Sequence, residues 1–397
     1  MPHSPLFTRP RFFRDVTFSR HTSRSIQWLE LFYDLVYVAT LIQIGNFLSD
    51  NVSIVGFGQF IVLMMVIWWA WTGETFYQNR YVSDDLLHRG IVFLQIFAIA
   101  SFGLSVSQAF GPLYVQFTIA YVLIRLGLIV MYLRAMRVHP ESRALSQGYA
   151  VGFSLGVLVW IGSLFLPSGL HWAGWLVGIV IELSVPLVPH MRRLQVQHPF
   201  DPHHIAERFG IFTLIVLGEA FVKILDDAQG ATITVAVLGF STVGLLVTYS
   251  LWWLYYSDTI DQGIDTTSPR KIIFWLYSHL PLVISLVTFG VAAKKVFAAA
   301  AEHPGEPLKL EYRLLYTAAL VLYLIAMMFI EYGIRNAQWR RIGLRLVSSV
   351  VVLLIGLFAT GLDATGFVGV MAVVMLVQVA ETILTPHSPP EAEHHSE

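Results

Sequence analysis

The sequence contains no cysteine and few charged residues. Because cysteine is absent from all 397 residues, disulfides, thiolate nucleophiles, iron–sulfur clusters and cysteine-ligated zinc sites are excluded. Lysine and arginine number 25 and aspartate and glutamate 26, so the formal net charge is -1 and no basic excess exists to attract nucleic acid. Charged residues make up only 13% of the chain, about half the usual share in soluble domains.

Hydrophobic residues take the place of the missing charges. They form 56% of the chain, and the mean hydropathy is +0.65. This composition indicates an integral membrane protein with many spans. The first 25 residues are polar and rich in arginine without an apolar core, so we expect no cleavable signal peptide before the first hydrophobic run.

Long apolar runs predict the transmembrane helices. A helix needs about 20 apolar residues to cross about 30 Å of hydrocarbon. Twelve such runs lie approximately at 28–49, 54–73, 90–108, 113–134, 146–166, 171–189, 206–225, 232–256, 271–295, 311–334, 342–361 and 364–385. They are continuously apolar rather than alternating, which favours helices over barrel strands. The expected fold is an all-α polytopic membrane protein with about twelve transmembrane helices.

Arginine and lysine in alternate loops predict the orientation of these spans. The positive residues are Arg9, Arg11, Arg14, Arg20, Arg24, Arg80, Arg89, Arg134, Arg137, Arg143, Arg192, Arg193, Arg270, Lys271, Arg335, Arg340 and Arg341. The other loops nearly lack positive charge, except that Lys294, Lys295, Lys309 and Arg313 flank the segment between spans nine and ten. We interpret that segment as a longer external loop and expect both termini in the cytoplasm, as in a multi-pass protein of the cell membrane.

Short matches between the two halves predict an internal repeat. In order along the chain, Glu30–Phe32 matches Glu207–Phe209, Ile67–Trp71 matches Leu251–Tyr255, Ser101–Gly103 matches Thr288–Gly290, and Val177–Gly178 matches Val368–Gly369. Six spans in each half make the repeats parallel, related by an axis along the membrane normal. Similar hydropathy alone also produces weak self-similarity and is the alternative explanation.

The apolar runs and the predicted orientation together divide the chain into five segments. They are a cytoplasmic N-terminal segment (1–27), a first transmembrane half (28–189), a cytoplasmic connecting loop (190–205), a second transmembrane half (206–385) and a disordered cytoplasmic tail (386–397). The tail is polar and contains proline, so its His394 and His395 are not expected to be catalytic.

Ionisable residues within spans cost about 2.5–3.5 kcal/mol each, so each needs a partner, a hydrated cavity or a function. Glu30 and Asp34 share one face of the first span, and Glu219 and Lys223 have the same spacing in the seventh. Two carboxylates on one face suggest a proton or cation site. Their position close to the cytoplasmic boundary also fits simple contact with water or Arg24.

Three charges lie deeper. Arg125, Glu182 and Glu219 are about 10–20 Å from the cytoplasmic boundary at 1.5 Å per residue. Arg125 cannot lose its proton, so we expect Glu182 or Glu219 to pair with it. The remaining acid is the natural protonation site unless Lys223 neutralises it. The alternative is a structural salt bridge that fixes helix register.

Histidines offer weaker candidates. His279, two residues before Pro281 in the ninth span, fits either a hydrogen-bonded core residue or a proton carrier. His198, His203 and His204 precede the seventh span in a segment broken by proline, without the i, i+4 spacing of helical metal ligands. We expect no metal site there.

Two segments resemble a known family. The run Trp28–Val38 resembles the E-L-F-[FY]-D-L-V-[FY]-V opening of the bacterial low temperature requirement protein A family, and His204–Glu219 is similar to its second signature, H-x-x-E-R-[FY]-G-L-F-x-x-I-x-L-G-E. The resemblance implies a multi-span protein of the bacterial inner membrane, linked by name to growth at low temperature, and supplies no activity. The polar positions that it marks are Glu30, Asp34, His204, Glu207, Arg208 and Glu219. We expect Asp34 and Arg208 to meet as a cytoplasmic gate.

Three functions compete. A secondary transporter of an unidentified small molecule, with proton coupling as one form, fits the twelve spans, the repeat and the deep charges. An intramembrane enzyme acting on a lipid or isoprenoid lacks the expected aspartate-rich or paired-histidine clusters, and a sensor or channel of membrane state is the third alternative. No G-x-x-x-x-G-K-[ST] motif is present, and we expect no cofactor. The expected partners are membrane lipid, the small molecule and a second copy of the chain.

Overall fold

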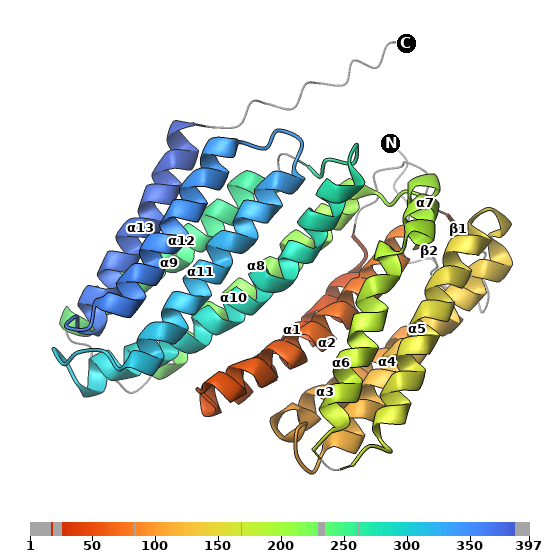
Figure 1. Cartoon of the computed structure of the whole chain (residues 1–397), viewed down its shortest axis with the longest axis horizontal. Helices are drawn as coiled ribbons and strands as arrows, with labels where there is room; N and C mark the ends of the chain where they lie inside the picture. The colour runs from red at the N-terminus through yellow and green to blue at the C-terminus, as the bar shows by residue number, and fades with distance from the viewer. Residues whose placement is uncertain are drawn as a thin grey trace. The chain divides into compact units, whose positions relative to one another are not determined.

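The described part of the chain is mostly helical. The computed structural model describes residues 17–18, 26–82, 85–167, 169–228, 235–259 and 263–385 (Figure 1). The tail 386–397 and the N-terminal arginines Arg9, Arg11, Arg14, Arg20 and Arg24 lie outside the described residues.

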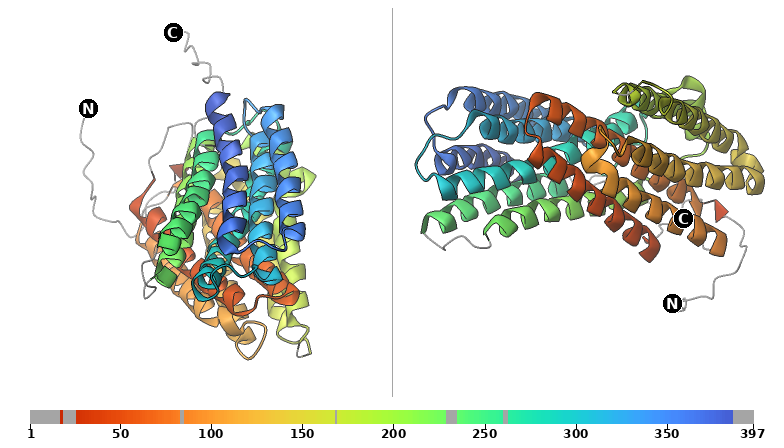
Figure 2. Two further views of the ribbon diagram at one scale, coloured as in Figure 1. Left: turned by 90° about the vertical axis from the view of Figure 1, so that its left-hand side faces the viewer. Right: turned by 90° about the horizontal axis from the view of Figure 1, so that it is seen from below.

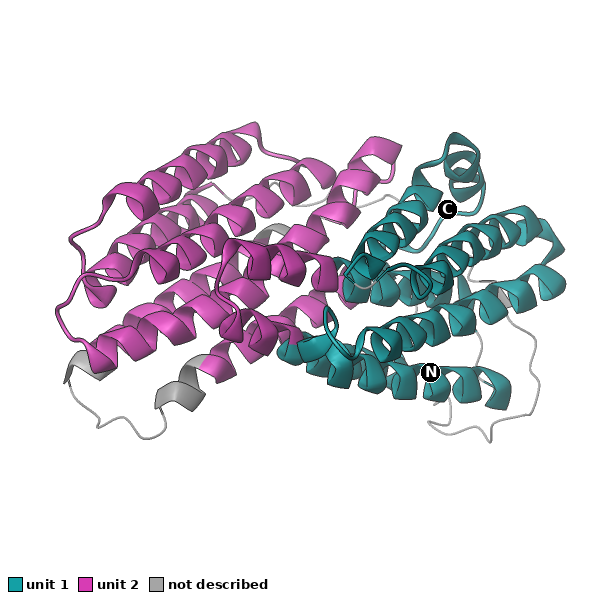
Figure 3. Cartoon of the chain, turned by 60° about the horizontal axis from the view of Figure 1, so that its bottom comes forward, with its two compact units in different colours: residues 1–43, 65–205 teal, residues 44–64, 206–397 magenta. Residues whose placement is uncertain are grey.

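The chain divides into two compact units, with the boundary of the main segments between residues 205 and 206 (Figure 3). Unit 1 comprises 1–43 and 65–205, and unit 2 comprises 44–64 and 206–397. Unit 2 therefore includes the turn between the first two helices, which hydropathy alone assigns to the first half. The division is made by packing rather than by order along the chain.

Unit 1 contains the first seven helices. They are α1 (Trp28–Asp50) and α2 (Ile54–Arg80), whose adjoining ends belong to unit 2, then α3 (Leu86–Ser105), α4 (Tyr114–Val138), α5 (Arg143–Ser163), α6 (His171–Ser184) and α7 (Pro189–Gln197). Short 3-10 turns η1 (Val106–Gln108), η2 (Pro140–Ser142) and η3 (Val185–Leu187) link some of them, and strand β1 (Thr17–Phe18) pairs antiparallel with β2 (Tyr81–Val82). From α3 to α6, consecutive helices pack against one another because their connections are short.

Unit 2 contains the remaining helices, α8 (Pro202–Ala228), whose first four residues belong to unit 1, α9 (Val235–Thr259), α10 (Pro269–Glu302), α11 (Leu310–Gly333), α12 (Trp339–Phe358) and α13 (Ala364–Leu384). Helix α11 packs between α10 and α12. Helices α9 and α13 lie side by side although they are far apart in sequence (Figure 2). Trp253 donates from Nε1 to Oγ1 of Thr382 at 2.9 Å across that contact.

A helix lies at each of the twelve positions that the apolar runs predict. Among the described residues, ten helices are long and apolar enough to cross a membrane, or up to eleven if the bent pair α6–α7 is one span. Helix α8 is not among them and carries Glu207, Arg208, Glu219 and Lys223. The chain is a multi-pass membrane protein, while length and composition do not confirm twelve spans.

The connecting loop predicted at 190–205 is mostly helical. Helix α7 begins with Pro189, which is suited to the first turn because its missing N–H needs no partner there. Met191 and Leu194, one turn apart, are buried, and a Cβ on Gly148 of α5 would collide with the Met191 sulfur. The hydropathy pattern missed α7 because the helix is short and polar apart from that one apolar stripe.

Helix α8 begins earlier than the apolar run predicts. Asp201 Oδ1 accepts from the backbone N–H groups of His203 and His204 at 3.0 and 3.2 Å, and Pro202 occupies the first turn. The capped turn places His203 and His204 on a helix rather than in the expected loop.

Arg313, one of the residues that break the orientation pattern, has a structural partner. Its Nε donates to the carbonyl of Gly356 at 2.7 Å and its Nη1 to that of Ala359 at 3.5 Å. These carbonyls belong to the end of α12, where a cation offsets the partial negative charge of unpaired C=O groups. The Arg313 side chain therefore caps a helix within unit 2.

Candidate functional site

Arg125 of α4 and Glu182 of α6 form a buried ion pair inside unit 1. Nη2 of Arg125 lies 2.7 Å from Oε2 of Glu182, and neither side chain is exposed. The hydroxyl of Tyr121 joins them, because it donates to Oε2 of Glu182 at 2.7 Å and accepts from Nε of Arg125 at 2.8 Å. Of the two acids expected for Arg125, the structure shows Glu182 in contact.

Two glycines make room for this pair. A Cβ on Gly156 of α5 would lie 2.5 Å from Oε1 of Glu182, and one on Gly73 of α2 would lie 2.8 Å from Nη1 of Arg125. The pair therefore packs directly against two helix backbones. The Arg125 guanidinium also lies 5.1 Å from the ring centroid of Phe153.

The ion pair leaves polar atoms unused. Among the residues that the structure describes, nothing accepts a hydrogen bond from Nη1 of Arg125 or donates one to Oε1 of Glu182. A buried donor or acceptor without a partner costs about 1–3 kcal/mol. A hydrogen-bond partner for either atom would therefore stabilise the site.

Glu74 of α2 extends the polar cluster. It is buried, with Oε1 accepting from Gln78 at 2.9 Å and Oε2 from Gln95 of α3 at 3.2 Å. Gln95 also donates to the carbonyl of Ile124, the residue before Arg125, at 3.2 Å. We call Glu74, Gln95, Tyr121, Arg125 and Glu182 the polar interior of unit 1.

The hydropathy pattern did not mark Glu74 as a residue of a span, because the second apolar run ends at residue 73, just before it. Helix α2 continues to Arg80, so Glu74 lies well inside the helix. Gln78 lies four residues after Glu74, which is the spacing of a hydrogen-bonded pair on one helix face. This spacing is the sequence feature that could have indicated a buried Glu74.

The two signature segments meet at one end of unit 1. Oε2 of Glu30 lies 3.5 Å from Nε2 of His204. Asn79 of α2 lies 3.2 Å from Nδ1 of His204 and also exchanges two hydrogen bonds with the backbone of Asp201. A residue of α2 outside both motifs therefore connects them.

Glu30 and Asp34 have different neighbours although they share a helix face. Asp34 accepts from Nε1 of Trp71 at 2.7 Å, while Glu30 lies against His204. Asp34 belongs to unit 1 and Arg208 to unit 2, so their expected meeting as a gate stays a prediction.

The other candidates lie in unit 2. His279 is fully buried, with Nδ1 2.7 Å from the carbonyl of Trp275 and Nε2 3.2 Å from the hydroxyl of Tyr255. This is the arrangement of a hydrogen-bonded core histidine. On α8, Glu207 and Glu219 are half-buried, while Arg208 and Lys223 are buried.

The predicted equivalence of tryptophan pairs is not reproduced in burial. Trp68 and Trp69 are buried, with 1% and 3% of their surface exposed, whereas Trp252 and Trp253 are half-buried. The internal repeat stays a prediction.

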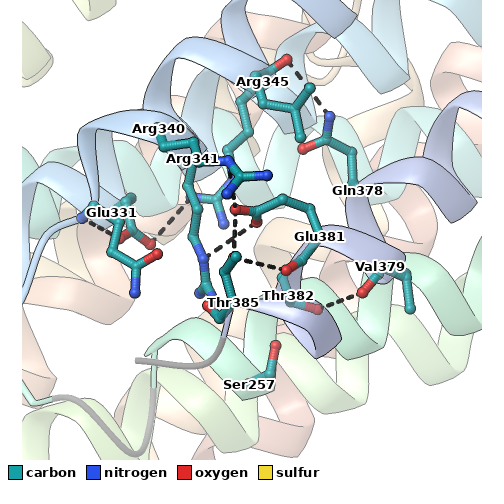
Figure 4. Close-up of polar contacts among 12 residues, drawn as sticks. Ser257, Glu331, Arg340, Arg341, Arg345, Gln378, Val379, Glu381, Thr382 and Thr385 are labelled. Atoms are coloured by element: carbon teal, nitrogen blue, oxygen red, sulfur yellow. Dashed lines mark hydrogen bonds and ion pairs between the residues drawn. The ribbon is translucent and has the colours of Figure 1, made fainter. Parts of the chain in front are cut away.

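Unit 2 holds a second network of buried charges, which sequence reasoning missed (Figure 4). Arg345 Nη1 lies 3.4 Å from Oε2 of Glu331, and Arg341 Nε lies 3.3 Å from Oε2 of Glu381. Arg341 also donates to the carbonyl of Thr385 at the end of α13, at 2.6 Å. Each residue lies near a predicted span end, where charges usually face water. The spacing of Arg341 and Arg345, four residues apart on one face of α12, is the sequence feature that could have indicated this network.

The sequence comparison decides the family. The model of the bacterial low temperature requirement A protein (LtrA) family matches residues 25–380. The chain belongs to this family. It is also similar to the uncharacterized protein RA0937 of Rhizobium meliloti (strain 1021), with 26% identity over 274 residues, covering 66% of this chain and 67% of that protein. The LtrA match includes both signature segments and the whole polar interior of unit 1.

Proposed function

We propose that this LtrA family protein is a secondary transporter of a small anionic molecule, coupled to protons, with the polar interior of unit 1 as its pathway. The observation that carries the proposal is the position of Glu182. It pairs with Arg125 in the bilayer interior and lies six residues before Val188, where the helical segment His171–Leu187 ends and the chain bends by 50° into α7. Discontinuous helices that carry polar groups near the break are typical of transporter sites.

The chemistry of the pair supports proton coupling. Arg125 keeps its charge, whereas Glu182 can take up a proton and become neutral. A neutral Glu182 holds the guanidinium less strongly, which frees Arg125 for a carboxylate or phosphate group of the substrate. Loss of that proton restores the ion pair and releases the anion. The substrate and the ion pair thus compete for one cation.

The proposed architecture has twelve spans in two parallel halves, 28–189 and 206–385, in the bacterial inner membrane with both termini in the cytoplasm. A helix at each expected position and the contact between the two signature segments support it. In the second half, Glu219 and Lys223 are the proposed counterparts of the ionisable residues in unit 1.

The test uses purified protein in proteoliposomes that contain a pH-sensitive dye. A panel of small mono- and dicarboxylates and inorganic phosphate is added outside, and proton movement is recorded. We expect at least one anion to drive proton movement with wild-type protein and none to do so with folded Glu182→Gln protein, although breaking the buried pair should lower its melting temperature. Lys295→Gln, which removes a half-exposed charge on α10, is the control and should behave as wild type.

Wild-type protein that moves no proton with any member of the panel would contradict proton-coupled anion transport. A stable Glu182→Gln protein with unchanged proton movement would remove the ion pair from the mechanism. Turnover of a lipid in the same vesicles would favour the intramembrane enzyme.

A further inference from the structure

An apolar pocket opens in unit 2, away from the polar interior of unit 1. It lies between the turn that joins α1 to α2 and the first turns of α11, and its volume is about 630 Å³. Leu48 and Leu315 form its buried base, and Phe57 and Ala318 line its walls. Pockets of about 300–1,000 Å³ hold small ligands, so its size suits a single chain of a lipid.

The pocket lies at the ends of candidate membrane-spanning helices, the level at which such helices meet the lipid headgroups. Its rim lies at the ends of three helices, since α1 ends at Asp50, α2 begins at Ile54 and α11 begins at Leu310. Leu315 is about 8 Å further along α11 at 1.5 Å per residue, which places the base within the hydrocarbon. Ile54 on the rim is 94% exposed, as expected of a side chain that contacts lipid.

Two opposite charges stand at the rim. Lys309 and Glu311 both line the pocket and are both exposed. Nζ of Lys309 lies 5.8 Å from the ring centroid of Tyr312, and no ion pair to either charge is found within the described part of the chain. Unlike Arg313, which caps α12, Lys309 therefore has no anionic or carbonyl partner among the described residues.

We propose that this pocket binds a zwitterionic phospholipid with a primary ammonium group, as in phosphatidylethanolamine. One acyl chain occupies the apolar pocket, the phosphate contacts Lys309 and the ammonium donates hydrogen bonds to Glu311. A net anionic lipid would meet repulsion from Glu311, and a choline headgroup has no N–H to donate. This lipid site does not depend on the proposed transport function.

The experiment measures lipid retention by the full-length protein. Purified chain in detergent is mixed with phosphatidylethanolamine, phosphatidylcholine, phosphatidylglycerol or diacylglycerol of identical acyl chains, and bound lipid is counted by native mass spectrometry. We expect phosphatidylethanolamine to bind at least threefold more strongly than the other three lipids. Equal binding of diacylglycerol would overturn the headgroup contacts, and equal binding of phosphatidylglycerol would overturn the role of Glu311.

Variants separate the two charges from the pocket itself. Glu311→Gln should lose the preference over phosphatidylglycerol, Lys309→Gln should weaken binding of all three phospholipids, and Ala318→Phe should fill the pocket and weaken binding of every lipid. Lys295→Gln is the matched control for the loss of one lysine and should change nothing. If both variants stay folded, the Lys309 variant keeps the wild-type affinity for the phospholipids and the Glu311 variant keeps the wild-type preference, the proposal is wrong. Because both residues are exposed, their substitution should leave the melting temperature unchanged.

Discussion

Gly156 and Glu182 pack so closely that a Cβ on the glycine would lie 2.5 Å from the carboxylate oxygen Oε1. Glu182 is fixed at the same time by Arg125 and Tyr121, so it has little freedom to withdraw. The absence of a side chain at residue 156 is thus a condition for the ion pair.

Gly156→Ala should therefore destabilise the protein, by about 1–3 kcal/mol for overpacking of a filled interior. Gly162→Ala is the matched control, because it lies on the same helix and has no atom within 4 Å of the added Cβ. The control should leave stability unchanged or raise it slightly. Melting temperatures in detergent compare the two, and equal effects would show that Glu182 is not held against α5.

Glu331→Gln should be strongly destabilising. The substitution keeps the size of the side chain but leaves Arg345, which is 1% exposed, without the carboxylate at 3.4 Å. Breaking a buried ion pair costs about 3–5 kcal/mol. Arg340→Gln is the control, since that arginine is 72% exposed and 3.9 Å from Glu381, and a surface pair contributes about 0–1 kcal/mol. Similar melting temperatures for both variants would show that the Glu331–Arg345 pair stabilises the fold no more than a surface pair does.

Asp265 should make stability depend on pH in the acid range. It lies between α9 and α10; burial would raise its pKa, but hydrogen bonds from Thr267 and Lys271 outweigh burial and hold the pKa below its ordinary value of 3.8. A lowered folded pKa contributes stability above the unfolded value, and that stability is lost as pH falls through the folded pKa.

Wild-type protein should therefore have a higher melting temperature than Asp265→Asn at pH 6. The difference between the two melting temperatures should shrink below a pH of about 4. Melting temperatures recorded from pH 6 to pH 3 check this. A difference that stays constant over the whole range would show that the Asp265 carboxylate does not stabilise the fold.

The orientation can be tested with reporter cysteines, because the natural chain has none. Ser49→Cys, half-exposed near the end of α1, should react with a membrane-impermeant maleimide in intact cells. Gln197→Cys, exposed at the end of α7, should react only after the membrane is opened. Ser142 is unsuitable although it lies in a predicted cytoplasmic loop, because it is fully buried and its hydroxyl accepts from Tyr81. The reverse labelling would invert the predicted topology.

The sequence predicted what depends on local composition. Apolar runs of fixed length located the helices, and the cost of burying Arg125 predicted a carboxylate partner. It could not choose between Glu182 and Glu219, since that choice depends on which helix packs beside α4. Glu74, Arg345 and Glu331 were missed for a similar reason, because a charge near a span end is buried or hydrated according to its neighbours.

Short elements could not be predicted from the sequence either. Helix α7 is stabilised by contact with α5, and β1 pairs with β2 across a long separation in sequence. Neither carries a periodic pattern long enough to be recognised alone.

We propose that water and substrate can enter the polar interior of unit 1. Thr72 tests it most directly, because it precedes Gly73 on α2, is 1% exposed, and its hydroxyl has no hydrogen-bond partner among the described residues. Thr72→Cys in proteoliposomes of known orientation is treated with a membrane-impermeant thiol reagent from each side, at pH 5 and pH 8. Ser349→Cys, 5% exposed in unit 2, is the buried control. We expect labelling of Thr72→Cys that changes with pH and with side while the control stays unlabelled; a cysteine at Thr72 that reacts from neither side at either pH would contradict entry of water into the polar interior of unit 1.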